Sequence, residues 1–412
     1  MATIEKETAR RSEKEASRRV PNRSTTPVSD RFRAYIAEGW APRVEAEAKP
    51  REQASFAAKR RERLSARYPG RRLIVPAGGR KRRSNDTDYP FRAHAAFAYL
   101  TGWGADSEPG SVLVFEPTAT GHETTLYFRE RAGRDSDEFY ANPEIGEFWI
   151  GPRPSLRHVA GDLALPTRPL AEADQIVAGA DETTLIVREA DQALTARVDA
   201  ARGGEDDART AADAELAREL SEMRLVKDSY EVARVREAIA ATADGFDDVI
   251  RALPRAVAHR RGERLVEGVF NTRARAEGNA VGYDTIAAAG PHACILHWTR
   301  NDGAVRPGEL ILIDAGVEGD DYYTADITRT LPVGGTFSAT QRLVYEAVRE
   351  AADAAFRIVR PGIRFRDVHA TAMAVIARRT AEWGMLPVDA REAQKPENQQ
   401  YRRYMVHGTS HH

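Results

Sequence analysis

The sequence predicts an α/β domain followed by an α+β domain in which helices pack on an antiparallel sheet. In the first half of the chain, short apolar strands alternate with helical stretches, which is the pattern of an α/β domain. In the second half, two strand-like stretches flank a turn and lie between long amphipathic helices. The length of 412 residues is sufficient for two or three domains, each with its own core.

Composition excludes several classes of protein. The 61 basic and 62 acidic residues give a formal net charge of −1, so we expect neither a nucleic acid nor a membrane surface as partner. The single cysteine, Cys294, excludes an intramolecular disulfide framework and a Cys-based zinc site, which favours a reducing cytoplasm. No apolar run approaches the roughly 20 residues that span a bilayer, and we find no export signal.

Residues 1–50 are predicted to be a disordered or extended leader. Arg, Glu, Ser and Pro dominate up to Ser29, with few large apolar residues. A short helix is expected to follow, with Asp30 as its N-cap and an apolar face that includes Tyr35. That face could contact a partner or another subunit, but a solvated leader is the simpler interpretation.

Residues 51–200 are predicted to form the α/β domain. A basic helix over residues 56–68 ends at Pro69-Gly70. No glycine-rich phosphate loop follows a strand, so we do not expect nucleotide binding. The expected strands are residues 71–76, 111–116, 124–128 and 185–187.

Residues 201–222 are predicted to connect the domains, because Gly203-Gly204 precedes a run of acidic residues. The second domain, residues 223–412, should then begin with a long helix whose apolar positions recur at three- and four-residue steps. Two further helices are expected after the strand pair. They cover residues 340–359 and 366–383, with Pro361-Gly362 between them.

The strand pair contains two acids, Asp314 and Asp326, in apolar surroundings. The apolar run 310–313 has the composition of a buried strand, residues 318–321 form the turn, and residues 322–330 form the second strand. A turn centred on residues 319–321 places Asp314 directly opposite Asp326, with Cβ atoms about 4.5–5.5 Å apart. Two carboxylates at that distance repel each other, so a divalent metal between them is favoured. The alternative is two surface acids on an edge hairpin whose register is slipped by one residue.

Two histidine-bearing stretches accompany the acids. Residues 294–298 have the composition of an apolar strand that contains His297. A lone strand histidine is more often a satisfied core residue, but the neighbouring acids favour a functional role. The terminal stretch contains His407 and His411 around Gly-Thr-Ser. An affinity-tag remnant is the alternative for a terminal His-His, and the spacing of these two histidines argues against it.

These motifs in this order resemble the Xaa-Pro aminopeptidases (aminopeptidase P), metallopeptidases of the pita-bread fold shared with prolidases. The resemblance covers about residue 56 to the last residue. The stretches that carry it are Ile295-Leu296-His297-Trp298, Leu312-Ile313-Asp314-Ala315-Gly316, Ala325-Asp326-Ile327-Thr328-Arg329-Thr330, His407-Gly408-Thr409-Ser410-His411, Met223 to Asp228 with Glu231, and Ser84 to Arg92 with Tyr99 to Gly102.

The resemblance implies a role for each matched residue. Asp314 would bind one metal ion, Asp326 would bridge two ions, and His411 would bind the other ion. His297 and His407 match histidines that contact the substrate and stabilise the reacting carbonyl, and Tyr283 matches a substrate-site tyrosine near the bridging aspartate. The implied cofactor is a pair of divalent ions, most often Mn²⁺, and oxygen-rich ligation with one imidazole is compatible with manganese. A homo-oligomer is possible.

The implied reaction is release of the first residue from peptides with proline in second position. Two cations about 3.5–4 Å apart would supply a hydroxide that attacks the Xaa-Pro carbonyl, and His297 or His407 would stabilise the oxyanion. The chain ends at His412, inside the last motif, whereas the family continues with two glutamate ligands, one of them the expected proton carrier. We therefore expect a pita-bread domain that is incomplete at its C-terminal end, in an inactive fragment.

Two other functions stay open from the sequence. Prolidase has the same fold and metals but cleaves only Xaa-Pro dipeptides, and the stretch from Ser84 to Arg92 favours the aminopeptidase. A non-catalytic peptide-binding pita-bread module is the second alternative. The presence of Asp314, Asp326 and His411 together weighs against it.

Overall fold

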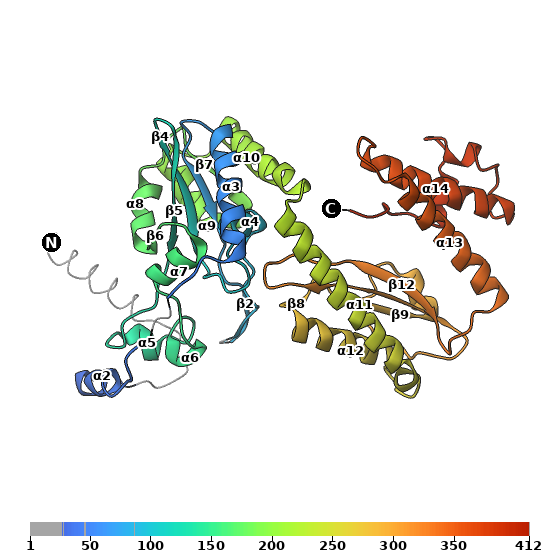
Figure 1. Ribbon diagram of the computed structural model, residues 1–412, viewed down its shortest axis with the longest axis horizontal. Helices are drawn as coiled ribbons and strands as arrows, with labels where there is room; N and C mark the ends of the chain where they lie inside the picture. Colours follow the sequence, from blue (N-terminus) through green and yellow to red (C-terminus); the bar gives the residue numbers. More distant parts are fainter. Residues whose placement is uncertain (1–26, 28, 45–46, 86, 412) are drawn as a thin grey trace, which may run out of the picture. The chain divides into compact units, whose positions relative to one another are not determined.

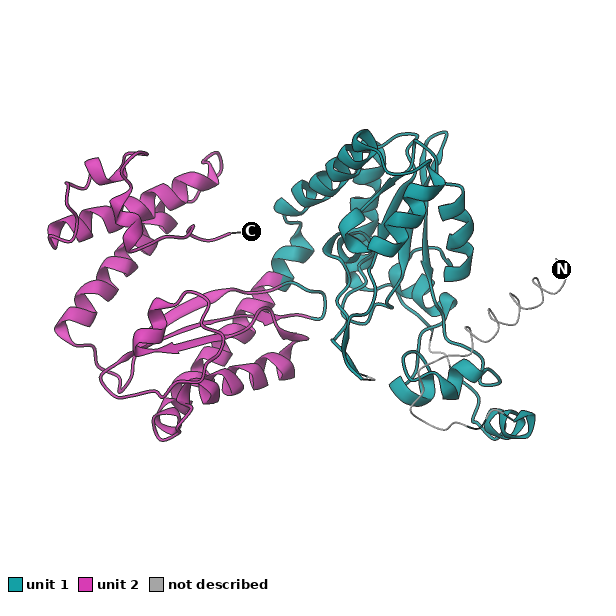
Figure 2. Cartoon of the chain, turned by 180° about the vertical axis from the view of Figure 1, so that it is seen from behind, with its two compact units in different colours: residues 1–234, 320–323 teal, residues 235–319, 324–412 magenta. Residues whose placement is uncertain are grey.

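The computed structural model describes residues 27, 29–44, 47–85 and 87–411. Most of the predicted leader therefore lies outside the described residues. The chain divides into two compact units, residues 1–234 with 320–323 and residues 235–319 with 324–412 (Figure 2). This division falls inside one helix, α11 (Ser229–Val257). None of the described helices is long and apolar enough to cross a membrane.

Unit 1 is built on a five-stranded mixed sheet in the order β6-β5-β4-β1-β7. β1 pairs antiparallel with β4 and parallel with β7, while β5 pairs antiparallel with β4 and parallel with β6. Four of these five strands were predicted from the sequence, and only the edge strand β6 was not. The strands are β1 (Leu73–Pro76), β4 (Val112–Thr118), β5 (Gly121–Phe128), β6 (Thr167–Pro169) and β7 (Leu185–Ile186).

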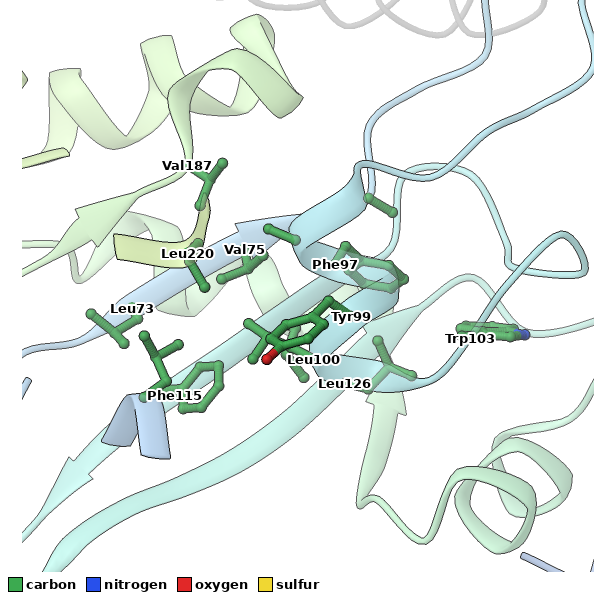
Figure 3. Close-up of a cluster of buried hydrophobic side chains, with 14 of the residues drawn as sticks. Leu73, Val75, Phe97, Tyr99, Leu100, Trp103, Phe115, Leu126, Val187 and Leu220 are labelled. Carbon is green, nitrogen blue, oxygen red and sulfur yellow. The ribbon is translucent and has the colours of Figure 1, made fainter. Parts of the chain in front are cut away.

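Helices cover both faces of this sheet (Figure 1). One face packs against α3 (Glu52–Arg67), α4 (Ala95–Thr101), α7 (Leu156–Leu163) and α10 (Asp207–Leu225), and the other against α8 (Ala173–Ala178) and α9 (Gln192–Ala201). Figure 3 shows Leu73 and Val75 of β1 beside Phe97, Tyr99 and Leu100 of α4 in the larger core. Full burial of such side chains stabilises by about 1.5–3 kcal/mol each.

The remaining elements of unit 1 are short. An exposed hairpin, β2 with β3, lies between β1 and α4. The helix predicted near residue 30 is present as α2, but Ser29 rather than Asp30 is its N-cap, since the Ser29 hydroxyl accepts a hydrogen bond from the Phe32 N–H. The bounds are α2 (Asp30–Ala37), β2 (Arg82–Ser84), β3 (Thr87–Asp88), α5 (Asp137–Ala141), α6 (Glu147–Ile150), η1 (Leu170–Glu172) and η2 (Arg188–Ala190).

The stretch predicted to connect the domains is mostly helix and belongs to the core of unit 1. In α10, Leu216, Leu220 and Met223 are fully buried in the larger core. The Gly203-Gly204 pair is only the turn between α9 and α10, with both residues at positive φ. Sequence composition indicated a break at this turn but not the apolar stripe that follows it.

Unit 2 is an antiparallel sheet with helices packed on it, as predicted. A three-stranded sheet has the order β12-β10-β9, and β8 pairs with β11 beside it. The helices α11 and α12 share one core with these strands, including Phe246, Val249, Phe270 and Ile311. The bounds are α12 (Gly262–Glu277), β8 (Ala280–Val281), β9 (Ile286–Ala289), β10 (Leu310–Ala315), β11 (Val317–Glu318) and β12 (Ile327–Pro332).

Three details of this unit differ from the prediction. Residues 294–298 are not a strand: the 3₁₀ helix η3 (Gly290–Cys294) leads into a turn, and Ile295 and Leu296 are about half exposed. The second hairpin strand begins at Ile327 rather than Tyr322. In α11, Ile239 of the expected apolar stripe is also largely exposed, so only the later part of that stripe enters the core.

The last two predicted helices form a pair with a small core of its own. They are α13 (Ala339–Ile358) and α14 (Phe365–Glu382), followed by η4 (Glu392–Gln394) and η5 (Gln400–Arg403). Ser338 and Gln341 make a reciprocal capping box at the start of α13. Alanines line the contact with α14, while Leu343 and Val344, which we expected on the buried side, are about half exposed.

Candidate metal centre

The strand β10 presents Asp314 on the sheet face opposite the core. Burial alternates along the strand, with Ile311, Ile313 and Ala315 buried and Asp314 half-buried between them. Side chains alternate between faces in a strand. Asp314 is therefore on the partly open face.

The register of the hairpin differs from the prediction by two residues. Asp314 pairs with Thr328, not with Asp326. A shift of one residue would have moved Asp326 to the other face, whereas a shift of two keeps both acids on the same face. The two carboxylates are therefore diagonal neighbours rather than directly opposed, and the alternative register, slipped by one residue, is not the one that forms.

A glycine explains why the strands take this register. A Cβ atom on Gly316 would lie 1.6 Å from the carbonyl oxygen of Ala325, so only glycine fits where these two segments of the hairpin meet. The Ala325 N–H donates to the Val317 carbonyl at 3.1 Å and continues the pairing toward the turn. This close contact fixes Asp326 at the position just before β12.

The phenol of Tyr283 joins the two acids. Its hydroxyl lies 2.6 Å from Asp314 Oδ1 and 2.9 Å from Asp326 Oδ1. Burial and the hydrogen bonds to both carboxylates raise the pKa of Tyr283 well above its usual range, so it remains a protonated donor. One hydroxyl proton cannot satisfy both carboxylates at once, so the pair remains short of positive partners.

His411 completes the cluster from the other end of unit 2. Its Nε2 lies 2.9 Å from Asp326 Oδ2, and its side chain is 76% exposed. The segment that carries it is attached to α14 through His369, whose Nδ1 lies 3.0 Å from Thr409 Oγ1 and 3.2 Å from the Thr409 nitrogen. The acids and the imidazole predicted from separate motifs therefore meet at one place.

The other two predicted histidines do not join this cluster. His297 is exposed in the turn that follows η3. His407 is exposed, and its Nδ1 lies 2.8 Å from the neighbouring Gly408 carbonyl oxygen. In the described part of the chain, neither side chain hydrogen-bonds to Asp314, Asp326, Tyr283 or His411.

Comparison with known proteins identifies the family. Residues 233–412 match the model of metallopeptidase family M24, and residues 57–180 match that of the aminopeptidase P N-terminal domain. The chain is 45% identical to "Xaa-Pro aminopeptidase 1" of Streptomyces coelicolor over 93% of this chain and 75% of that protein. It is 46% identical to "Xaa-Pro aminopeptidase 2" of the same organism, over 93% of this chain and 79% of that protein. The chain belongs to the Xaa-Pro aminopeptidase family.

Solved structures of the family agree with the fold. Aminopeptidase P from Escherichia coli superposes with a TM-score of 0.70 at 26% identity, covering 87% of this chain and 80% of that one. Aminopeptidase PepP from Pseudomonas aeruginosa gives 0.68 at 29% identity, covering 84% of this chain and 76% of that one. The chain thus combines the N-terminal domain of the Xaa-Pro aminopeptidases with a C-terminal pita-bread domain.

The family implies divalent metal ions, and the residues of this chain fit such ions in kind but not in number. Two carboxylates and one imidazole are the donor types that suit a hard divalent cation, and the Tyr283 hydroxyl donates between the two carboxylates, where a cation would interact with both. Among the described residues, however, no three His, Cys, Asp or Glu side chains are grouped closely enough to hold a metal. Asp314, Asp326 and His411 therefore offer only part of the donors that a pair of divalent ions would need.

Two groups around the site were missed in the sequence. Glu263 and His292 hold the loop that bears His297, and His369 holds the segment that bears His411. Glu263 and His369 lie in helices of ordinary amphipathic composition, far along the chain from the groups that they contact, and His292 lies in the 3₁₀ helix η3. No spacing or local pattern links such residues to the motif that they support.

Proposed function

We propose that this chain has the substrate class of its relatives: peptides with proline in second position, from which the first residue is released. The observation that carries the proposal is the convergence of Asp314, Asp326, Tyr283 and His411 on one sheet face. Their identities and order along the chain match the motifs on which the resemblance rests. The same fold with the same N-terminal domain supports aminopeptidase rather than prolidase activity.

In this proposal, Asp314, Asp326 and His411 would hold a pair of Mn²⁺ ions. When bound, the ions would supply an activated water near neutral pH. The two carboxylates lie on one side of the sheet, so they fix where that chemistry takes place. Tyr283 keeps its proton, because its pKa is raised, and holds the two carboxylates together in the absence of metal.

His297 and His407 are the proposed substrate contacts. An imidazole N–H at either position would donate to the carbonyl oxygen of the residue before proline as negative charge develops there. Both side chains are exposed, which leaves them accessible to a peptide. Their separation from the acid cluster in this structure makes them binding groups for the substrate rather than metal ligands.

We further propose that the chain of 412 residues does not release the first residue by itself, and that the protein acts in the cytoplasm. Two carboxylates and one imidazole do not neutralise the charge of two divalent ions, and neither His297 nor His407 lies beside the acids to protonate the departing proline nitrogen. Release of alanine from Ala-Pro-Ala in the presence of Mn²⁺ tests this, because robust turnover would contradict it.

The proposed substrate class is tested by binding, which does not require turnover. Isothermal titration of Ala-Pro-Ala and its isomer Ala-Ala-Pro in Mn²⁺ buffer should show tighter binding of the peptide with proline in second position. The dipeptide Ala-Pro separates the aminopeptidase from the prolidase, which should prefer the dipeptide. Equal affinity for the two tripeptides would contradict the proposal.

A further inference from the structure

The proposed chemistry makes no use of a carboxylate that is completely buried in unit 2. Glu263 is the second residue of α12 and has a side-chain exposure of 0%. Burying a carboxylate without hydrogen-bond partners is costly. The partners that it has therefore indicate what the residue does.

Four donors surround the Glu263 carboxylate. Oε1 accepts from the Ala289 N–H at 2.8 Å and lies 2.8 Å from His292 Nδ1. Oε2 accepts from the indole N–H of Trp298 at 2.9 Å and from the Gly303 N–H at 2.7 Å. An ionised carboxylate offers about four acceptor positions. All four are occupied here.

These donors belong to one loop, residues 290–303, and to the strand that leads into it. Ala289 ends β9, His292 and Trp298 lie within the loop, and Gly303 is at its end. The rings of His292 and Trp298 are stacked with centroids 3.9 Å apart. One carboxylate thus attaches the beginning, the middle and the end of the loop to α12.

The close approach of the loop to Glu263 depends on a glycine. A Cβ atom on Gly303 would lie 2.7 Å from Glu263 Oε2 and 2.7 Å from the His292 ring. The backbone contact is reciprocal, because the Glu263 N–H donates to the Gly303 carbonyl at 3.2 Å. There is no room at this position for another side chain, so the carboxylate sits in a site built to fit it.

We infer that Glu263 is the positioning residue for His297. This inference rests on the proposed function, in which His297 contacts the peptide. The His297 side chain is exposed, so its place is set by the path of the loop rather than by packing. Glutamine at position 263 would turn two of the four acceptor positions into donors facing donors. The loop would then lose two of its attachments, although the size of the side chain is nearly unchanged.

The unique cysteine allows a direct test in the whole chain. Cys294 is exposed and lies in the same loop, so a nitroxide label can be attached without another substitution. We expect Glu263→Gln to increase the mobility of the label several-fold by electron paramagnetic resonance. The matched control is Glu267→Gln, one turn further along α12, which should leave the spectrum unchanged. A label that is equally immobile in Glu263→Gln and the parent would overturn the inference.

A milder variant covers the case in which Glu263→Gln does not fold. Trp298→Phe removes one of the four donors and keeps an aromatic ring beside His292. It should increase the mobility of the label by a smaller factor while thermal unfolding remains cooperative. An unchanged spectrum in this folded variant would also count against the inference.

A double-mutant cycle on peptide binding separates positioning from general stabilisation. Glu263→Gln and His297→Ala should each weaken binding of Ala-Pro-Ala, by about 2- to 10-fold for a lost hydrogen bond, and the double variant should be no weaker than His297→Ala. Additive losses would overturn the inference. If His297→Ala alone has no effect, the role proposed for His297 fails, and the mobility of the label still decides whether Glu263 positions the loop.

Discussion

Two clusters of acids in this protein differ in how their charge is balanced. In unit 1, Asp213 is fully buried and contacts Arg188 and Arg202, and both arginines also contact Asp199. In unit 2, Asp314 and Asp326 share the Tyr283 hydroxyl, and Asp326 also contacts His411. Within the described residues, no arginine or lysine lies at ion-pair distance from Asp314 or Asp326.

The difference shows how a structural acid cluster can be told from a functional one. Two arginines and two aspartates neutralise each other, and the Asp213 carboxylate also accepts the Ile186 N–H at 3.0 Å. That cluster is complete and holds α9, α10 and β7 together. The acids of unit 2 repel each other with one shared hydroxyl between them. Such a pair gains from an added cation, whereas the unit 1 cluster does not.

The largest expected effect comes from breaking the complete cluster. Replacing Arg202, whose side chain is fully buried, by Met leaves Arg188 alone to balance both Asp213 and Asp199, so the cluster keeps one uncompensated negative charge. Removing one partner of a buried ion pair costs about 3–5 kcal/mol, so urea unfolding of unit 1 should shift to much lower concentration. Arg197→Met is the control, because the exposed Arg197–Asp174 pair should contribute about 0–1 kcal/mol. Similar losses for both variants would contradict the distinction.

The next effect concerns the incomplete cluster. At an Mn²⁺ concentration 100-fold above Kd, binding to the folded state alone should stabilise the parent by about 2.7 kcal/mol. Asp326→Asn should abolish this stabilisation, and without metal it should not destabilise unit 2, since it removes one of two repelling charges. Thermal unfolding with and without Mn²⁺ measures both effects.

Asp353→Asn, at an exposed position of α13, is the control for that experiment and should keep the full response to Mn²⁺. A loss of metal-free stability in Asp326→Asn as large as that of Arg202→Met would mean that the acids of unit 2 are a structural pair. The comparison of the two clusters would then fail.

A smaller effect is expected at the shared hydroxyl. Tyr283→Phe removes the donor to both carboxylates, and a hydrogen bond contributes about 0.5–1.5 kcal/mol. The loss should appear only without metal, because a bound cation would take over the role of the phenol proton. Tyr345→Phe, on the exposed side of α13, should have no effect in either condition. A loss in Tyr283→Phe that persists in saturating Mn²⁺ would contradict this role.

The smallest expected effect is a pH dependence in unit 1. Hydrogen bonds from Arg188 and then Arg202 hold the pKa of Asp199 below its usual range. The folded state therefore binds this proton less readily, and the stability contributed by Asp199 is present above the ordinary aspartate pKa of about 3.9 and lost as pH falls through the depressed value. The difference in urea midpoint between the parent and Asp199→Asn should shrink between pH 6 and pH 3. A constant difference would contradict the assignment.

Much of the fold could be predicted because hydrophobic periodicity and turn residues along the sequence indicate its helices and strands. The helix over residues 56–68, four of the five strands of the unit 1 sheet and the helices after the strand pair were all predicted from periodicity and turn residues. The pairing of residues 310–315 with the strand after the turn was also predicted. The apolar composition of residues 294–298 was misleading, because the strand that it indicated is a turn held by Glu263.

The sequence by itself determined which residues could share a face. Side chains alternate between the two faces of a strand. Asp314 and Asp326 therefore lie on the same face both in the predicted register and in the observed one, which differ by two residues, so a convergence of acids could be expected before the register was known. Only the tertiary structure decided the register, through the contact of Gly316 with Ala325, and the path of the loop that carries His297, through a buried carboxylate. Periodicity is a property of neighbouring residues, whereas steric fit and buried hydrogen bonds join residues that are far apart along the chain.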